Sequence, residues 1–237
     1  MFAGAAAYLK LRKPATRQIG AAWLHRYAQR MLRAMDITVS VSGVYPSQGV
    51  VISNHVTYVD IAVYSALHPC VFVSKVEIGS WPVIGYMTTV AGTVYVERGR
   101  GGSAARSGAG MQKASDDGLP VVFFPEGTTG DGLTLLSFRS GLLAQARSEE
   151  QPVTAAHIRY TIKGKNPPGT NVKDDVSYWD DTPILKHMFR FLKLRGVHAD
   201  VRFADAPIVF HSSMDDRKAA AEEARAAVQA LADQHSV

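Results

Sequence analysis

Short apolar runs alternate along this chain with longer segments in which apolar residues recur every three or four positions. Short runs are typical of strands buried on both faces, and the longer repeat is typical of helices. The pattern predicts strands at 38–44, 50–52, 71–73, 93–96, 121–124, 152–160 and 198–203. It predicts helices at 17–35, 57–67, 104–117, from about 138, near 182–194 and over the last 20 residues.

Strands that alternate with helices indicate an α/β fold, in which helices flank a mainly parallel mixed sheet. The segments between these elements differ in composition. Residues 80–90 are predicted to be mixed helical or irregular, and 99–103 to be a glycine-rich loop. Residues 164–180, which include Pro, Gly, Asn and Asp, are predicted to form a long loop. The last helix opens on Ser213-x-x-Asp216, a capping pattern, and we expect it to have a structural role only.

The N-terminal helix combines an apolar repeat with a strong positive charge. The repeat has steps of four and consists of Ile19, Trp23, Tyr27, Met31 and Met35. The first 35 residues hold seven basic residues and no acid, which leaves 19 basic against 21 acidic residues in the rest of the chain. We therefore expect residues 1–36 to be a basic amphipathic helical segment that contacts a membrane, followed by an α/β domain at 37–237. Alternatively, the helix packs on the core with a solvated basic face, and both can hold along different turns.

Composition excludes several classes of protein. A hydrophobic content of 46% and a charged content of 20% are ordinary for a globular chain, which argues against general disorder. The single cysteine, Cys70, rules out an internal disulfide and lies in an apolar run, where a thiol is usually a small buried hydrophobe. No run of 18 apolar residues is present, so we expect no transmembrane helix in this sequence. No nucleic-acid recognition motif accompanies the basic residues, so we expect no nucleic-acid partner.

The segment from Ser53 to Asp60 leaves a predicted buried strand and enters a predicted helix. Functional sites of α/β sheets collect at the carboxyl ends of strands, which is where this places His55. A histidine can take a proton near neutral pH, and an aspartate about one turn onward can orient its ring. The alternative is that Thr57 and Asp60 form a helix cap and that His55 is an ordinary turn residue.

Two further segments place polar residues after buried strands. In 121–132 a strand runs into a glycine-rich turn whose amides can bind an oxyanion or a phosphate. The Glu126 side chain in this turn can bind hydroxyl groups of a ligand. The alternative is a turn built from residues that simply favour turns. Arg98, at the end of 92–98, can grip a phosphate, and Lys75 has a similar place after an earlier strand. Each of these two is alternatively a surface ion-pair partner.

Together these segments carry a recognisable order. Asn54-His55-x4-Asp60, then Val96-Glu97-Arg98, then Phe124-Pro125-Glu126-Gly127-Thr128 resembles the glycerophospholipid acyltransferase family, whose best-known members are lysophosphatidate acyltransferases. The resemblance runs from about 50 to 160, nearly half of the chain, and each motif alone is far less specific than the combination. Between and after these motifs it includes Ser74-Lys75, 81–85, 138–141 and the weaker Pro152-Val153.

The resemblance implies a role for each matching residue. His55 would be the general base and Asp60 its partner. Arg98, with Lys75, would hold the acceptor phosphate. Glu126 and Gly127 would bind the acceptor or shape the site. Asn54 and Thr128, in the same motifs, complete the expected substrate-binding set.

The implied reaction moves a fatty acyl group from acyl-CoA or acyl-carrier protein to the hydroxyl of 1-acylglycerol-3-phosphate or a related lysophospholipid. It needs no cofactor or metal, and we expect it at the cytoplasmic face of the cell membrane, on a peripheral or monotopic protein. Absence of Gly-x-Ser-x-Gly argues against a serine hydrolase, and absence of His-Glu-x-x-His or Cys-x-x-Cys argues against a metal site. The alternatives are a lyso-ornithine lipid acyltransferase and a non-catalytic lipid-binding protein of the same fold. The stretch 178–180 weakly resembles family members that act on lysophospholipids or lyso-ornithine lipids.

Overall fold

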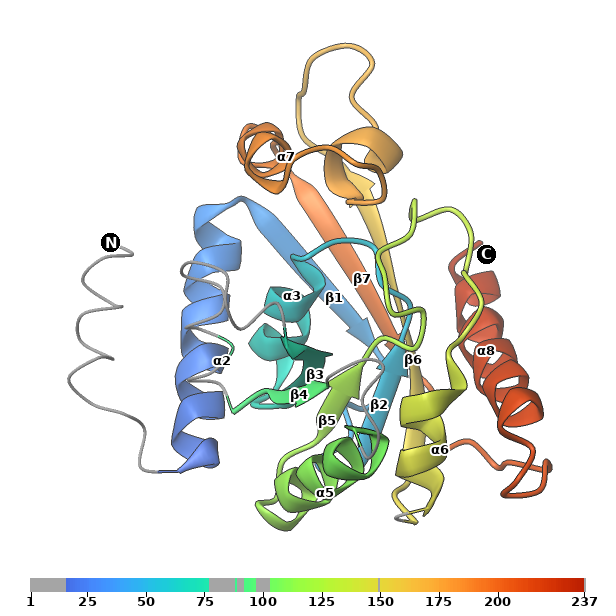
Figure 1. The fold of residues 1–237 in the computed structure, drawn as a ribbon. Helices are drawn as coiled ribbons and strands as arrows, with labels where there is room; N and C mark the ends of the chain where they lie inside the picture. The colour runs from blue at the N-terminus through green and yellow to red at the C-terminus, as the bar shows by residue number, and fades with distance from the viewer. Residues whose placement is uncertain (1–15, 77–87, 89–91, 97–102, 149, 237) are drawn as a thin grey trace.

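The computed structural model describes residues 16–76, 88, 92–96, 103–148 and 150–236 (Figure 1). The strands are β1 (Ile37–Ser42), β2 (Val50–Ser53), β3 (Val71–Lys75), β4 (Val94–Val96), β5 (Val121–Phe123), β6 (Val153–Ile162) and β7 (Val197–Phe203). The helices are α2 (Arg17–Ala34), α3 (Asp60–Leu67), α5 (Ser103–Asp116), α6 (Ser140–Ser148), α7 (Ile184–Phe191) and α8 (Arg217–Asp233). A π-helical turn at Val172–Val176 and a 3-10 turn at Gln234–Ser236 complete the described elements.

The described strands form one seven-stranded sheet in the order β1-β7-β6-β2-β5-β3-β4. Strands β2 to β6 are parallel to their neighbours within that group, whereas β7 is antiparallel to β6 and parallel to β1. The predicted mainly parallel mixed sheet is therefore confirmed. Because β2 to β6 point the same way, their carboxyl ends share one edge of the sheet, with β2 and β5 at its centre.

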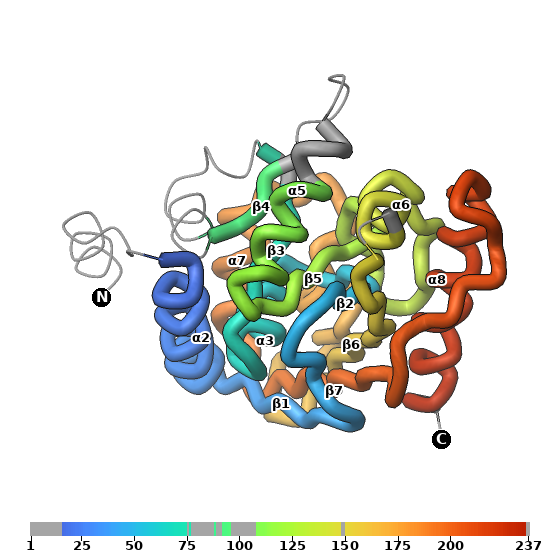
Figure 2. Tube along the Cα trace, turned by 90° about the horizontal axis from the view of Figure 1, so that it is seen from below, coloured from blue at the N-terminus to red at the C-terminus, as the bar shows by residue number. Residues whose placement is uncertain are grey.

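Helices cover both faces of this sheet, and alternate residues of each strand contact different helices (Figures 1 and 2). Val51 of β2 and Val122 of β5 pack in a cluster with α2, α3 and α7. Their neighbours Ile52 and Phe123 pack on the opposite face with α5, α6 and α8. Strands buried on both sides in this way account for the continuous apolar runs in the sequence.

Helix α2 packs on the core through its small and apolar residues. Leu24, Ala28 and Leu32 are buried against the cluster that includes α3, while Arg26 and Arg30 are exposed. The predicted repeat is only partly the covering face: Trp23, Met31 and Met35 are partly buried against this cluster, whereas Ile19 is 51% exposed. Residues 1–15 lie outside the described residues, and the membrane contact expected of 1–36 stays a prediction.

Several element boundaries differ from those predicted. Helix α3 begins at Asp60 rather than at 57, because the Asp60 carboxylate holds the preceding turn by accepting from two of its amides. The expected loop at 164–180 contains the π-helical turn, which is capped by the side chain of Asn171 accepting from the Asp174 N–H at 2.9 Å. The cap of α8 is Asp216, which accepts from the Ala219 N–H at 2.9 Å, and not Ser213. The segments 80–90 and 99–103 lie almost entirely outside the described residues.

Cys70 is buried immediately before β3 and has no disulfide partner. Its burial raises the pKa of the thiol to about 12. The prediction of a small buried hydrophobe at this position is confirmed. Within the described ranges, no helix is both long enough and apolar enough to cross a membrane.

Candidate active site

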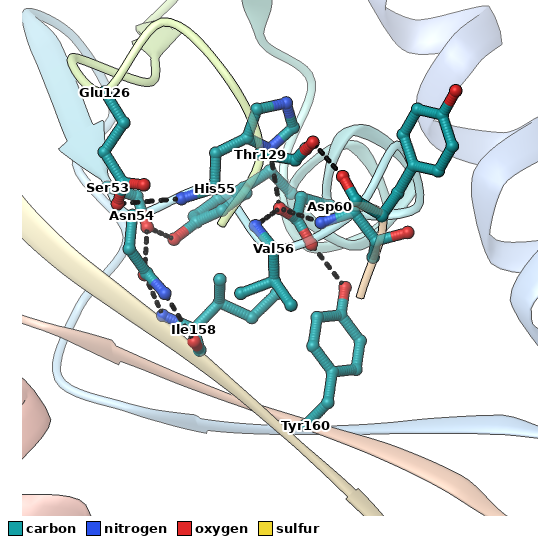
Figure 3. A network of polar contacts seen from close by, with 12 residues as sticks. Ser53, Asn54, His55, Val56, Asp60, Glu126, Thr129, Ile158 and Tyr160 are labelled. Carbon is teal, nitrogen blue, oxygen red and sulfur yellow. Dashed lines mark hydrogen bonds and ion pairs between the residues drawn. The ribbon is translucent and has the colours of Figure 1, made fainter. Parts of the chain in front are cut away.

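The chain leaves the central strand β2 at Ser53 and turns back into α3 at Asp60, at the carboxyl edge of the sheet. His55 lies within this turn, and its Nδ1 is 2.7 Å from Asp60 Oδ2 (Figure 3). The structure therefore brings together the two residues that the sequence singled out. This edge is where α/β sheets place their ligands, because the loops that leave parallel strands converge there.

Asp60 is fully buried, and both oxygens of its carboxylate accept hydrogen bonds. Oδ2 accepts from the N–H groups of Val56 at 2.7 Å and Thr57 at 3.1 Å, in addition to His55 Nδ1. Oδ1 accepts from the Tyr160 hydroxyl at 2.7 Å, and burial raises the pKa of this tyrosine well above its usual range. A buried charge needs such partners, and here they also fix the carboxylate in one position.

The imidazole of His55 is held in one orientation by contacts on two sides. Its ring stacks on Phe124, with ring centres 4.0 Å apart and planes 6° from parallel. Since a carboxylate only accepts, Nδ1 carries the proton of this hydrogen bond, which leaves a lone pair on Nε2. Figure 3 shows that second nitrogen directed away from the buried network. The His55 side chain is 17% exposed, so the site reaches solvent on this side.

Hydrogen bonds within the sheet hold the backbone before His55. The Asn54 side chain donates to the Ile158 carbonyl at 2.9 Å and accepts from the Ile158 N–H at 2.8 Å, which ties β2 to β6. The buried Ser53 hydroxyl accepts from the Tyr64 hydroxyl of α3 at 2.6 Å. Asn54 therefore positions the turn. Its expected contact with substrate stays a prediction.

Glu126 lies beneath the His55 backbone with only 3% of its surface exposed. Its Oε1 accepts from the His55 N–H at 3.4 Å, and its Oε2 is buried without a hydrogen-bond partner in the described chain. Burial raises the pKa of Glu126 to about 8, and nearby Asp60 and Asp131 add to this, while the His55 N–H opposes it. The carboxyl group is thus largely neutral at pH 7, which suits an acid with one unpartnered oxygen.

The glycine-rich turn after β5 closes over the backbone of the His55 turn. Gly127 has φ +67°, in the left-handed region, and its N–H donates to the Phe124 carbonyl at 3.0 Å. The Gly130 N–H donates to the His55 carbonyl at 2.8 Å. The Thr129 hydroxyl donates to the Tyr178 carbonyl. Thr128, between Gly127 and Thr129 in sequence, is exposed. The amides of Thr128 and Thr129 donate to no acceptor in the described part of the chain.

The two predicted phosphate-binding residues are less completely placed. Lys75 ends β3 in register with Val96 of β4, at the same edge of the sheet as His55. Arg98 follows β4 by two positions and lies outside the described residues. The position of the Lys75 backbone agrees with the expected site, and both phosphate contacts stay predictions.

Sequence reasoning missed the residues that support the pair from distant segments. Tyr160 lies in β6, 100 residues after Asp60, and nothing local in the sequence indicates their contact. Tyr58 donates toward His187 Nδ1 at 3.1 Å, and the Tyr178 N–H donates to the Val56 carbonyl at 2.9 Å. A large polar aromatic in an apolar run was the available signal, since a buried tyrosine hydroxyl needs a partner.

Within the described residues, no group of three or more His, Cys, Asp or Glu side chains is arranged to hold a metal ion. The arrangement instead consists of one oriented imidazole, a saturated carboxylate and a turn with free amides. Such a site can remove a proton from a hydroxyl group and stabilise a developing negative charge.

Comparison with known proteins agrees with this chemistry. Residues 36–159, just over half of the chain, match the family model described as Acyltransferase. The lyso-ornithine lipid O-acyltransferase of Brucella abortus is 32% identical, over 76% of this chain and 69% of that protein. Its counterpart in Pseudomonas aeruginosa is 31% identical, over 80% of this chain and 73% of that protein. The 1-acyl-sn-glycerol-3-phosphate acyltransferase of Neisseria meningitidis is 36% identical, over 55% of this chain and 52% of that protein.

A solved structure supports the fold independently. The crystal structure of the 1-acyl-sn-glycerophosphate acyltransferase from Thermotoga maritima superposes with a TM-score of 0.64 at 16% identity, and covers 98% of this chain and 88% of that one. At this identity the likeness shows the fold alone. The family model and the relatives described above show more: this protein belongs to the acyltransferase family, as an O-acyltransferase of the lysophosphatidate acyltransferase-like type.

Proposed function

We propose that this enzyme transfers a fatty acyl group from the thioester of acyl-CoA or acyl-carrier protein to the free hydroxyl of a lysolipid, at the cytoplasmic face of the cell membrane. The observation that carries the proposal is the His55–Asp60 pair, in which Nδ1 is 2.7 Å from the carboxylate while Nε2 points away from the network. A base so oriented can accept the acceptor's proton without first rearranging.

The proposed reaction is direct transfer. His55 Nε2 takes the proton of the acceptor hydroxyl as its oxygen attacks the thioester carbonyl carbon. The tetrahedral intermediate then expels the thiolate, the C–S bond breaks, and the imidazolium returns its proton to the leaving sulfur. The products are an ester and a free thiol, so no acyl-enzyme and no cofactor are required. Asp60 stabilises the imidazolium that forms between these two proton transfers.

The turn after β5 is the proposed site for the oxyanion. Its Gly127 and Gly130 amides already have acceptors, whereas those of Thr128 and Thr129 do not within the described chain. Donors that are free in the resting state can be committed to charge that develops only in the transition state. Glu126 shapes this turn from below, through its contact with the His55 backbone.

Two acceptors are supported by different observations. Two lyso-ornithine lipid acyltransferases align over at least three quarters of this chain, which favours that lipid. Lys75 at the edge of the sheet, with Arg98 in the motif order, favours the phosphate of 1-acylglycerol-3-phosphate. Both lipids present a hydroxyl beside a long acyl chain, so the chemistry proposed for His55 is the same.

The test is to supply one acyl-CoA with a panel of lysolipids, and to measure both free thiol and product mass. We expect one acceptor to give a product heavier by one acyl group, with one thiol released per product. The His55→Ala variant is expected to lose activity by 10²-fold or more, as removal of a general base does. His211→Ala is the matched control, because His211 is exposed on a loop before α8.

Each proposed point can fail separately. Near-normal transfer by His55→Ala would contradict the base mechanism. Lysolipid binding without any release of thiol, from either acyl-CoA or acyl-carrier protein, would instead indicate the non-catalytic lipid-binding alternative.

A further inference from the structure

Helix α7 has two faces of different character. His187, Phe191 and the following Leu194 are buried in the core. Leu185 and Phe189, by contrast, are each 62% exposed, and their spacing of four places them on the same side of the helix. Leu192, three positions onward, is 46% exposed. Contiguous apolar side chains exposed to water are uncommon on a protein surface, and such a stripe is typical of a site that binds another molecule or a membrane.

The inner face of α7 holds the His55 turn in place. Tyr58 lies between His55 and Asp60 in sequence, and its hydroxyl donates to His187 Nδ1 at 3.1 Å. The other ring nitrogen of His187 donates to the Ser177 carbonyl at 2.8 Å, and burial lowers the pKa of this histidine. Tyr58 also packs on the ring of Phe191. Helix α7 therefore lies beside the candidate active site, at the same end of the molecule (Figure 1).

Basic residues flank the apolar stripe. Residues 184–195 contain four basic side chains and no acid: Lys186, Arg190, Lys193 and Arg195. Three of the four are exposed, while Arg190 lies 3.6 Å from Asp175. The nearby acids precede α7, and three of them take part in local turns. Asp174 and Asp175 bond Asn171, and Asp180 bonds Thr182, whereas Asp181 is exposed.

The basic end of α2 lies next to this surface. The Asp36 carboxylate, which follows α2, accepts at 2.7 Å from the N–H of Gly196, which lies between α7 and β7 and directly precedes β7. This bond joins the end of α2 that carries the exposed Arg30 and Arg33 to the end of the α7 segment. Trp179, 44% exposed before α7, lies under the Lys173 ammonium at 4.6 Å. Tryptophan and basic residues around an apolar stripe are typical of a surface at a bilayer interface.

We propose that the outer face of α7 docks on an anionic lipid bilayer, with Leu185, Phe189 and Leu192 among the headgroups and the basic flank toward lipid phosphates. This docking presents the carboxyl edge of the sheet to the membrane, where a lysolipid resides. The inference thus extends the proposed function, although the docking itself requires no catalysis. Charge selects lipid over a second copy of this chain, because two copies meeting at α7 would bring like charges together.

The experiment is flotation of the full chain with vesicles of phosphatidylcholine alone or mixed with phosphatidylglycerol. We expect binding to the anionic vesicles, and expect Leu185→Ser/Phe189→Ser and Lys186→Glu/Lys193→Glu each to weaken it by tenfold or more. The matched control is Val209→Ser/Met214→Ser, which are 74% and 54% exposed. Val209 follows Ile208, whose N–H bonds Val153 at the amino end of β6, so this control lies at the opposite end of the sheet.

Activity on lysolipid in detergent micelles separates docking from catalysis. The α7 variants should keep it and lose activity only on vesicles. Unchanged vesicle binding by both α7 variants would overturn the proposal, as would a wild-type dimer that Leu185→Ser/Phe189→Ser converts to monomer by sedimentation. If the wild type floats with anionic vesicles but transfers no acyl group to any lysolipid, the proposed function fails while the docking surface stands.

Discussion

The turns after β2 and β5, neighbouring strands at the centre of the sheet, treat their carboxyl groups in opposite ways. Asp60, at the end of the first turn, is fully buried and accepts four hydrogen bonds. Glu126, at the start of the second, is almost as buried, accepts one bond at 3.4 Å and leaves Oε2 without a partner in the described chain. The same edge of one sheet thus holds a carboxylate that accepts four hydrogen bonds and a carboxyl group with one oxygen that lacks a partner in the described chain.

The two carboxyl groups therefore have different roles in the site. Saturation fixes Asp60 as an anion of defined position, which is what an orienting partner for an imidazole requires. Burial without saturation favours the protonated form of Glu126, so this side chain adds little negative charge next to His55 at neutral pH. Substitutions at Asp60, Glu126, Tyr160 and Thr57 test this contrast between the two carboxyl groups.

Asp60→Asn removes the charge while keeping the shape. We expect activity to fall by about 10²- to 10⁴-fold, because the amide no longer selects the His55 tautomer, and the free energy of unfolding to fall by about 3 kcal/mol, because four donors lose their anion. Acyl transfer and urea unfolding measure the two effects. Asp215→Asn, at an exposed position, is the control. Retained activity in Asp60→Asn would show that saturation serves stability alone.

Glu126→Gln replaces the carboxyl group, whose pKa is raised, with a neutral amide that does not titrate. The pKa of Glu126 is about 8 in the fold against 4.5 as its ordinary value. Over this window the folded state keeps a proton that the unfolded chain loses, so its stabilising contribution is complete below pH 4.5 and disappears as pH rises through 8.

We therefore expect Glu126→Gln to gain stability relative to wild type between pH 5 and 8, by about 2 kcal/mol. Urea unfolding at both pH values measures this relative change. Parallel curves for the two proteins across this range would mean that Glu126 ionises normally and that the contrast with Asp60 is wrong.

Tyr160→Phe removes one of the four donors to Asp60. We expect a loss of about 1 to 2 kcal/mol in the free energy of unfolding, and less than a tenfold loss of activity, since three donors still position the carboxylate. Thermal or urea unfolding and the acyl-transfer rate at saturating substrate check this. An activity loss as large as that of Asp60→Asn would show that the far side of the carboxylate, and not its contact with His55, governs the site.

Thr57→Val tests the capping interpretation of this turn. The Thr57 hydroxyl is buried without a hydrogen-bond partner in the described chain, so its removal is expected to change the free energy of unfolding by less than about 1 kcal/mol. Loss of a threonine that caps the helix would instead lower the free energy of unfolding by about 1 kcal/mol or more. Activity should remain near normal in Thr57→Val. A clear loss of stability would restore Thr57 as a cap.

The sequence was sufficient for the parts of this molecule that depend on local patterns. Doubly buried runs predicted the central strands, and a histidine after one of them predicted where the candidate site would lie. The half of the capping pattern that forms is the contact of Asp60 with the Thr57 N–H, and the same carboxylate oxygen also holds His55. The two alternative interpretations of Asp60 were therefore compatible, which no count of residues could have indicated.

What the sequence could not show depends on contacts between distant segments. Tyr160 reaches Asp60 only because β6 lies beside β2, and the strand order is not written in any single element. The burial of Glu126 depends likewise on the turn that folds over it. The exposed stripe of α7 has the spacing of an ordinary core-facing helix, so the pattern alone predicts a helix without saying which side faces outward.

The rate at which Cys70 is alkylated reports how often the fold opens. As the chain's single cysteine, buried and with a thiol pKa raised to about 12, it resists alkylation until the fold opens around it. The mass gained during a brief pulse of reagent then counts opened molecules, and turbid vesicle suspensions do not disturb a mass measurement. Binding to the folded state alone lowers the opened fraction. The labelling rate on anionic vesicles therefore measures how strongly each variant binds the bilayer.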